Sequence, residues 1–220
     1  MELTWFGHSC FRLRGREATV ITDPPAASLG YIPGRQQADI VTISHQHAGH
    51  NNSEFCTPPC RVITGPGEYE AAGVFITGVP AFHDEQEGKE RGKNVMFAIA
   101  IDDVTVAHLG DLGHPLTAQL IEALGNVDVL LVPVGGQHTI DAAKAAELVA
   151  ALGVKLVIPM HYRTNAAHTA DLAPVERFLK EMGRAESAPQ AKVNITRSSL
   201  PAETQVVVLD AVGSRGGAGR

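Results

Sequence analysis

The sequence lacks any apolar run long enough to cross a membrane. A transmembrane helix needs about 18 or more consecutive apolar residues, and every hydrophobic stretch in this chain of 220 residues is shorter. The N-terminal residues MELTWFGHSC also lack the basic and apolar regions of a signal peptide. We therefore expect a cytoplasmic protein that has no membrane partner.

An excess of positive charge is missing as well. The net charge is −6 at pH 7, and the pI is about 5.9. Proteins that bind nucleic acid through its phosphates carry a basic face. We therefore expect no nucleic-acid partner, whereas a locally basic pocket for a small anionic molecule fits this composition. Nothing in the sequence indicates an oligomeric state.

Cysteine is scarce. Only Cys10, Cys56 and Cys60 occur, and an odd number at these spacings gives no disulfide framework. The pair in CTPPC, residues 56–60, could form half of a zinc clamp, but a second pair is absent. We expect ordinary reduced thiols. Histidine, in contrast, occurs ten times, and the positions of the histidines are more informative than their number.

The distribution of apolar residues predicts an α/β (α+β) protein. Short runs of β-branched and aromatic residues that end at glycine or proline are typical of strands, and apolar residues at helical spacing predict helices. Strands are expected at residues 3–6, 10–15, 18–24, 38–44, 61–64, 74–82, 95–102, 104–110, 127–136, 154–162 and 204–211. Helices are expected at residues 115–125, 139–153 and 171–183. The helices would then cover packed sheets.

The ends of the helices and of the domain can also be predicted. Thr139 and Asp171 are candidate N-caps, and Gly153 is a candidate helix end. Because no linker divides the chain, we expect one domain over residues 1–212. The remaining residues, 213–220, form a glycine-rich tail that we expect to be disordered.

Histidines and one aspartate follow the ends of several predicted strands. The stretch SHQHAGHNN, residues 44–52, begins with His45 directly after an apolar run, and His83, Asp111 and His161 follow other apolar runs. Each alone could be an ordinary surface or turn residue. Strands hold side chains rigidly, however, so residues from several strand ends can converge on one point. The set therefore predicts a metal site.

The donor types indicate which metals are suitable. Imidazole nitrogens and carboxylate oxygens without thiolates suit zinc, and also iron or manganese. His45 and His47 can present imidazoles on one side of an extended turn, while His50 can face a second metal. A carboxylate such as Asp111 can bridge two cations that are about 3.5–4 Å apart. One or two ions are therefore expected.

These residues resemble the signature of the metallo-β-lactamase fold superfamily, H-x-H-x-D-H followed by distant His, Asp and His. The matching segments are TWFGHSCFRL, VITDP, SHQHAGHNN, VPAFHDEQEGKERGKN, HLGDLG, LLVPVGG and VIPMHYRT. The first and last of them are similar to a compact branch that includes ascorbate-phosphate-lactonase-like and other uncharacterised zinc-dependent hydrolases. The resemblance extends over nearly the whole chain.

The resemblance implies a four-layer αβ/βα sandwich with metals in a cleft at the sheet edges. It also implies a role for each matching residue. The first metal would be held by His45, His47 and His83, the second by His50 and His161, with Asp111 bridging the two. Asp23 would support the metal-binding loop, and His8 would lie near the cleft as either a packed or a functional histidine.

Position 49 departs from this pattern. Gly49 stands where the family has an aspartate that binds the second metal and helps to orient the nucleophile. Since glycine has no side chain, the resemblance implies a complete first site and a second site that is weak, exchangeable or absent.

The expected activity is metal-dependent hydrolysis of a small substrate, such as a lactone or a phosphate ester. His138 and Asp84 are candidate general bases, and Asp111 would act in catalysis through the metals. Loop cations at Arg91, Lys93 and Arg163 could bind an anionic group. The alternative is a non-catalytic or regulatory protein that binds a metal or ligand on a hydrolase scaffold. A diiron redox protein is a further alternative, although no flavodoxin-like segment is present.

Overall fold

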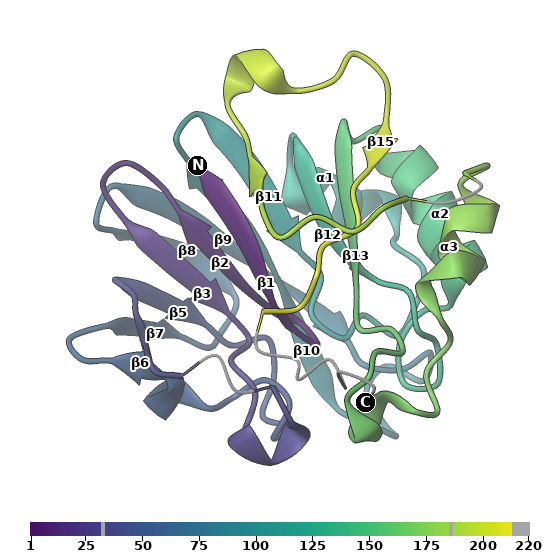
Figure 1. Ribbon diagram of the computed structural model, residues 1–220, viewed down its shortest axis with the longest axis horizontal. Helices are drawn as coiled ribbons and strands as arrows, with labels where there is room; N and C mark the ends of the chain where they lie inside the picture. The colour runs from purple at the N-terminus through teal and green to yellow at the C-terminus, as the bar shows by residue number, and fades with distance from the viewer. Residues whose placement is uncertain (32–33, 185–186, 213–220) are drawn as a thin grey trace, which may run out of the picture.

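Two mixed β-sheets face each other and enclose the main core (Figure 1). This architecture is seen in a computed structural model, which describes residues 1–31, 34–184 and 187–212. The predicted disordered tail at residues 213–220 lies outside the described residues. No helix among the described residues is long and apolar enough to span a membrane.

The first sheet is formed by the N-terminal third of the chain and one later strand. Its six strands have the order β14-β1-β2-β3-β5-β7. The strands are β1 (Glu2–Gly7), β2 (Cys10–Arg14), β3 (Thr19–Thr22), β5 (Ile40–Thr42), β7 (Arg61–Ile63) and β14 (Val193–Asn194). Strands β1, β2 and β3 are antiparallel neighbours, whereas β3, β5 and β7 run parallel. The short strands β4 (Gln36–Gln37) and β6 (Cys56–Thr57) pair separately.

The second sheet has seven strands in the order β15-β13-β12-β11-β10-β9-β8. They are β8 (Gly67–Ala71), β9 (Val74–Phe82), β10 (Lys93–Ile101), β11 (Val104–His108), β12 (Val129–Pro133), β13 (Leu156–Met160) and β15 (Gln205–Val206). Strands β8 to β11 form an antiparallel meander, and β11, β12, β13 and β15 are parallel. The carboxyl ends of the parallel strands therefore meet at one edge.

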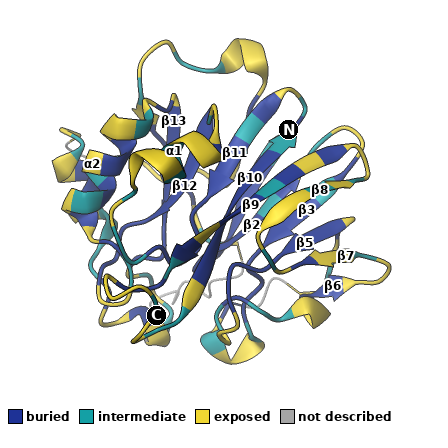
Figure 2. Ribbon diagram, turned by 180° about the vertical axis from the view of Figure 1, so that it is seen from behind, coloured by how far each residue is buried: buried dark blue, intermediate teal, exposed yellow. Residues whose placement is uncertain are grey.

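Alternation along the strands explains how the first sheet can be buried on both faces. Successive side chains of a strand point to opposite faces. Trp5 belongs to the main core between the sheets, and its neighbour Phe6 belongs to a smaller cluster with Ile21 and Phe55 on the other face. The central strands of the second sheet are mostly buried, as Figure 2 shows for β10 to β13, although Lys93 at the start of β10 is exposed.

Three α-helices of the described residues lie beside the second sheet (Figure 1). They are α1 (Ala118–Leu124), α2 (Ala142–Leu152) and α3 (Val175–Glu181), and α2 packs against both β12 and α3. Four short 3-10 helices complete the set: Ala27–Leu29, Ser53–Phe55, Ala167–Thr169 and Arg197–Ser199. The predicted helix end at Gly153 is confirmed, because this residue is the left-handed C-cap of α2.

Two predicted helix starts are wrong. Helix α2 is capped by Asp141, whose carboxylate accepts a hydrogen bond from the backbone N–H of Lys144, and not by Thr139. Helix α3 starts after Pro174, without a side-chain cap, and not at Asp171. A proline fixes the backbone angle φ near its helical value, so it favours a helix start without a capping hydroxyl or carboxylate.

The strand predictions are largely confirmed, with three differences. Strand β8 forms where no strand was predicted, and β15 is shorter than the predicted strand at residues 204–211. The two-residue strands β4, β6 and β14 are too short to give a periodic pattern. The three cysteines are free, as expected.

Candidate metal centre

The candidate ligands gather at one edge of the two sheets, because each follows the end of a strand. The six-stranded sheet supplies His8 from the β1–β2 turn, Asp23 after β3, and the segment 45–50 after β5. The seven-stranded sheet supplies the other residues: His83 after β9, Asp111 after β11, His138 after β12 and His161 after β13. Residues far apart in the sequence therefore line one cavity of about 350 Å³.

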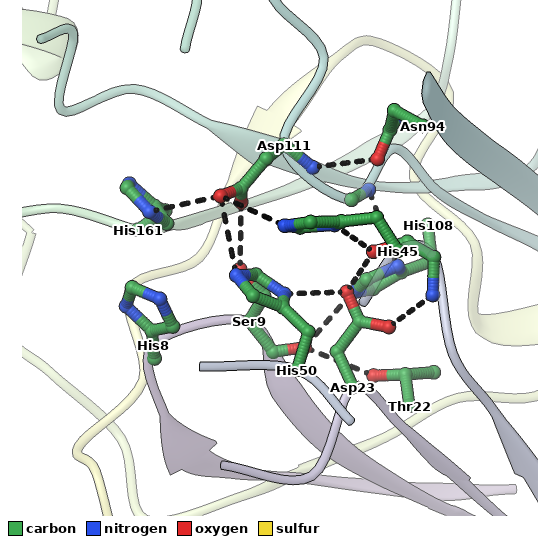
Figure 3. Close-up of polar contacts among 12 residues, drawn as sticks. His8, Ser9, Thr22, Asp23, His45, His50, Asn94, His108, Asp111 and His161 are labelled. Atoms are coloured by element: carbon green, nitrogen blue, oxygen red, sulfur yellow. Dashed lines mark hydrogen bonds and ion pairs between the residues drawn. The ribbon is translucent and has the colours of Figure 1, made fainter. Parts of the chain in front are cut away.

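The carboxylate of Asp111 lies at the centre of this cluster. Its Oδ2 atom is 3.1 Å from the Nε2 atom of His50, 3.3 Å from that of His83 and 3.4 Å from that of His161. The Nε2 atom of His45 is 3.8 Å away. Figure 3 shows the side chains of His45, His50 and His161 directed toward the carboxylate. One oxygen atom is thus close to imidazoles from both sheets.

The donor atoms form three groups, two of which contain the residues predicted as ligands. The third group, with Asp23, His45 and His50, shares one residue with each of them. Ligand atoms of His45, His47 and His83 lie within 4.8 Å of one another, which brings together the predicted first-metal residues. A second group within the same limit contains His8, His50, Asp111 and His161. The structure therefore brings together all six residues predicted as ligands and adds His8.

Asp23 is completely buried behind the ligands and anchors the loop that carries them. Its carboxylate accepts hydrogen bonds from the backbone N–H of Ser44 at 2.7 Å and from the Nδ1 atom of His50 at 2.8 Å. The Ser44 hydroxyl also donates to Asp23 and lies 2.9 Å from the Nδ1 atom of His45. This arrangement fixes the orientation of two imidazoles, which is the role expected for Asp23.

Three supporting residues were not predicted. The Asn94 side chain accepts from the backbone N–H of Asp111 at 3.0 Å and donates to Leu109 O at 2.9 Å. His108 is fully buried, and its Nε2 atom lies 2.8 Å from Ser9 O. Ser44 directly precedes the histidine cluster, so its position was a usable signal. Asn94 and His108 contact the site only through strand pairing, which no local sequence pattern reveals.

Three site residues have a left-handed backbone that side chains other than glycine rarely adopt. The φ angles are +53° at His8, +39° at Asp23 and +51° at His161. Such conformations cost about 1–3 kcal/mol each and occur mostly at functional sites. The fold therefore holds these three side chains in place at the expense of stability.

Two carboxylates set the charge of His50. Burial alone would lower the pKa of His50, but Asp111 and Asp23 outweigh it and raise that pKa to about 10. Burial also opposes the charged form of Asp111, yet His161 and His50 hold the pKa of Asp111 well below its ordinary value. Without a bound cation, His50 is therefore protonated and joins two ionised carboxylates.

The imidazoles of His45 and His8 are neutral and therefore have a free lone pair. Burial, followed by the charge of His50, lowers the pKa of His45 to about 3. Burial, together with His161 and His50, lowers the pKa of His8 well below its ordinary value. Neutral imidazole is the form that binds metals.

Unpaired buried nitrogens indicate that the donor set fits a cation. Six buried side-chain N or O atoms among the described residues have no hydrogen-bond partner, and four of them are ring nitrogens of His8, His45, His83 and His161. A buried polar atom without a partner costs about 1–3 kcal/mol. The Nε2 atom of His45 is one of these four atoms and faces Asp111. A divalent cation between the imidazoles and the carboxylate would satisfy this atom.

Arg91 and His138 lie on the wall of the cavity. The guanidinium Nη1 atom of Arg91 lies 2.7 Å from the Nδ1 atom of His138. Arg91 is held by the carboxylate of Asp84, which accepts four backbone N–H groups of the loop, including that of Arg91 at 2.8 Å. Asp84 thus organises the loop, which leaves it little capacity to act as a base. Lys93 and Arg163 are exposed and do not line the cavity.

The chain belongs to the metallo-β-lactamase superfamily. A family model described as a beta-lactamase superfamily domain matches residues 2–161. A protein of the metallo-beta-lactamase superfamily from Thermotoga maritima is 40% identical, with a TM-score of 0.78, and the match covers 94% of this chain and 97% of that chain. The predicted fold class and superfamily are thereby confirmed.

Relatives in archaea define the class of activity. A metal-dependent hydrolase of Methanoculleus marisnigri is 34% identical over 205 residues, covering 82% of this chain and 89% of the relative. One of Archaeoglobus fulgidus is 30% identical over 216 residues, covering 83% and 92%. The chain is thus a metal-dependent hydrolase of this superfamily.

Proposed function

We propose that the chain is a zinc-dependent hydrolase of a small ester, a lactone or a phosphate ester, that carries an anionic group. The observation that supports this most directly is the convergence of imidazoles from both sheets on one carboxylate, Asp111. The donors are nitrogen and oxygen without thiolate, which suits zinc and, less specifically, iron or manganese. The Thermotoga relative is assigned to zinc-dependent hydrolases.

Each part of the donor set has a proposed role. His45, His47 and His83 would hold one ion, and His50 and His161 a second, with Asp111 shared. Zinc in such a site supplies Lewis-acid chemistry, since it lowers the pKa of water and polarises the bond to be cleaved. Asp23 keeps His50 in the orientation that ligation needs, through the hydrogen bond to its Nδ1 atom.

Arg91 and His138 are proposed to recognise the charged part of the substrate. A guanidinium only donates hydrogen bonds, so the Nδ1 atom of His138 accepts from Arg91 and the ring proton is on Nε2. Burial and the charge of Arg91 lower the pKa of His138, which keeps the ring neutral. We therefore propose that His138 donates a hydrogen bond to the developing oxyanion, a role different from the base predicted earlier.

The shape of the cavity supports a small substrate. Its volume of about 350 Å³ is at the low end for small-molecule sites. Leu29 and Leu172 provide apolar walls beside the histidines, and Arg91 provides a positive charge. A compact ester with one anionic group matches these features, whereas the net charge of −6 does not favour a nucleic acid.

Metal removal and reloading test the proposal. The protein would be stripped with a chelator, dialysed, and reloaded separately with zinc, iron(II) or manganese(II). It would then be assayed with bis-p-nitrophenyl phosphate, p-nitrophenyl phosphate, and pairs of lactones that differ only in one carboxylate. We expect no turnover without metal, recovery with zinc, and a preference of about tenfold or more for the anionic member of each pair, as one charged hydrogen bond provides. Zinc-loaded protein that hydrolyses none of these esters would contradict the proposal.

Substitutions at His138 separate a hydrogen-bond donor from a base. His138→Ala is expected to lower kcat by about 10²–10³-fold, the usual cost of losing one oxyanion donor. His138→Gln keeps an N–H donor and should recover most of that loss, with the acid limb of the pH–rate profile unchanged. Zinc content and circular dichroism serve as controls for intact protein. Equal losses in both variants, with a displaced acid limb, would instead indicate a base.

A further inference from the structure

The imidazole of His8 fills the space that a side chain at position 49 would need. A Cβ atom built on Gly49 would lie 2.7 Å from the Nε2 atom of His8 and 3.0 Å from its Cδ2 atom. In an aspartate, each carboxylate oxygen is two bonds away from Cβ, which places it about 2.4 Å from that atom at standard bond lengths and angles. The Nε2 atom of His8 is therefore at nearly the same distance from this Cβ as a carboxylate oxygen of an aspartate would be.

The backbone does not require glycine at this position. Gly49 is not among the residues with positive φ, so other residues could adopt its conformation without strain. The next nearest atom to the built Cβ, Leu29 Cδ1, is at an ordinary contact distance of 3.6 Å. The conflict is thus with the imidazole of His8 alone, and the absence of a side chain at 49 provides the space for that ring.

The fold directs His8 into the site at a cost. Its backbone is in the left-handed region, and its carbonyl oxygen accepts hydrogen bonds from Trp5 Nε1 and from the backbone N–H of His161, both at 3.1 Å. Its ring centroid is 4.3 Å from that of His161 and 4.9 Å from that of His50. In Figure 3 the imidazole of His8 lies beside those of His161 and His50.

The His8 ring is close to the other donors and incompletely paired. Its Nδ1 atom is buried and has no hydrogen-bond partner. A packed histidine without a ligand would normally have its polar atoms satisfied. One donor atom of His8 lies within 4.8 Å of donor atoms of His50, Asp111 and His161, so a cation among these residues would be within reach of all four.

We propose that His8 is a ligand of the second metal position, in the place that Gly49 leaves open. The second position then has three imidazoles and the shared carboxylate of Asp111. It is a complete site, which replaces the expectation of a weak one.

A ligand role of His8 would also affect the substrate preference of the protein. This consequence rests on the proposed function. A neutral imidazole in place of a carboxylate leaves Asp111 as the only anionic ligand in the donor set. Two bound zinc ions then keep more positive charge than they would with an aspartate at position 49. This charge favours an anionic substrate, in agreement with Arg91 at the cavity wall.

Zinc binding to four variants tests the proposal without any assay of turnover. The variants are His8→Asn, Gly49→Asp, the double variant His8→Asn with Gly49→Asp, and His168→Ala. Asparagine tolerates the left-handed backbone at position 8, but its side chain is shorter than imidazole. His168 is the matched control, because it lines the same cavity, with its ring 5.4 Å from that of His8, but belongs to none of the donor groups. Stepwise affinities would be measured by competition with a chromophoric chelator, and stoichiometry by elemental analysis.

We expect the native protein and His168→Ala to bind two zinc ions. His8→Asn should lower the affinity for the second zinc ion by about 100-fold, which is the upper end of the cost of losing a residue that supports a metal site. The double variant should recover most of this loss, and Gly49→Asp alone should give no gain, because its Cβ displaces His8. Circular dichroism and urea unfolding would show that each variant is folded.

Three results would overturn the proposal. They are a native protein that binds only one zinc ion, unchanged affinities in His8→Asn, or a double variant no better than His8→Asn. A protein that binds two zinc ions through His8 but hydrolyses no ester would contradict the proposed function and leave this inference standing. The two failures are therefore distinguishable.

Discussion

Asp111→Asn is expected to abolish metal-dependent hydrolysis, with a fall in kcat of at least about 10³-fold, more than one oxyanion donor contributes. The Oδ2 atom of Asp111 lies within 3.1–3.4 Å of the Nε2 atoms of His50, His83 and His161. An amide has nearly the same shape as a carboxylate but carries no charge. Its nitrogen can neither accept a hydrogen bond nor bind a metal ion as a carboxylate oxygen does. In the proposed assignment both metal positions share this carboxylate, so the affinities for both ions should fall.

The measurements are kcat with the best ester of the panel and the zinc stoichiometry of the same samples. Asp103→Asn is the matched control, since the Asp103 side chain is 83% exposed and its ion-pair partner is Arg16, which is not a ligand. It should retain native activity and two zinc ions. An Asp111→Asn protein that keeps both ions and more than a tenth of the native rate would show that Asp111 is not shared between them.

Asp23→Ala is expected to lower the free energy of unfolding of the metal-free protein by about 3–5 kcal/mol, the usual cost of removing one partner of a buried ion pair. The alanine would leave the backbone N–H of Ser44 and the Nδ1 atom of His50 without their acceptor. Because the total stability of a domain is only about 5–15 kcal/mol, a loss of this size can unfold Asp23→Ala. Asp23→Asn is therefore included as a milder second variant. Its amide oxygen can still accept from Ser44, and its loss should be smaller.

Urea unfolding of metal-free samples would measure this effect. Asp39→Ala is the matched control, because Asp39 is exposed and accepts one backbone N–H, that of Thr19. It should cost about 1 kcal/mol, as for a single ordinary hydrogen bond. Equal losses in Asp23→Ala and Asp39→Ala would contradict the anchoring role of Asp23.

The effect of Asp23 should also depend on pH. In the folded metal-free protein the pKa of His50 is raised from 6.5 to about 10, partly by Asp23. A raised pKa contributes stability that is complete below pH 6.5 and is lost as the pH rises toward 10. The difference in unfolding free energy between native protein and Asp23→Asn should therefore be largest near pH 6 and decrease toward pH 10. Asp23→Ala and Asp23→Asn should both bind zinc about 10–100-fold more weakly than native protein does, because Asp23 orients His50.

The strand ends, and with them the predicted ligands, could be identified from the sequence for a physical reason. Apolar runs in this chain are buried strands, and a polar residue directly after such a run has to leave the core at the sheet edge. His83 and His161 directly follow β9 and β13, whereas His45 and Asp111 lie three residues beyond β5 and β11. Helix starts were harder to locate, because Thr139 and Asp141 are both good caps and the sequence alone does not choose between them.

Contacts across the sheets could not be predicted in this way. His8 and Gly49 are far apart in the sequence, and their relation depends on how the β1–β2 turn meets the loop after β5. Gly49 alone suggested a missing ligand. The geometry shows another side chain in the space that glycine leaves. Asn94 likewise reaches Asp111 only because β10 pairs with β11.

The division of the ligands between the two sheets determines when the protein can acquire its metal during biosynthesis. His8 and the segment 45–50 come from the first sheet, but His161 follows β13, which must pair with β12. More than a hundred residues separate His50 from His161, which a ribosome adds in roughly 5–20 s. Until then the early histidines lack their partners in the second sheet. Stable metal uptake is therefore expected to follow the docking of the C-terminal sheet, and a chain stalled before residue 161 would carry an incomplete histidine cluster.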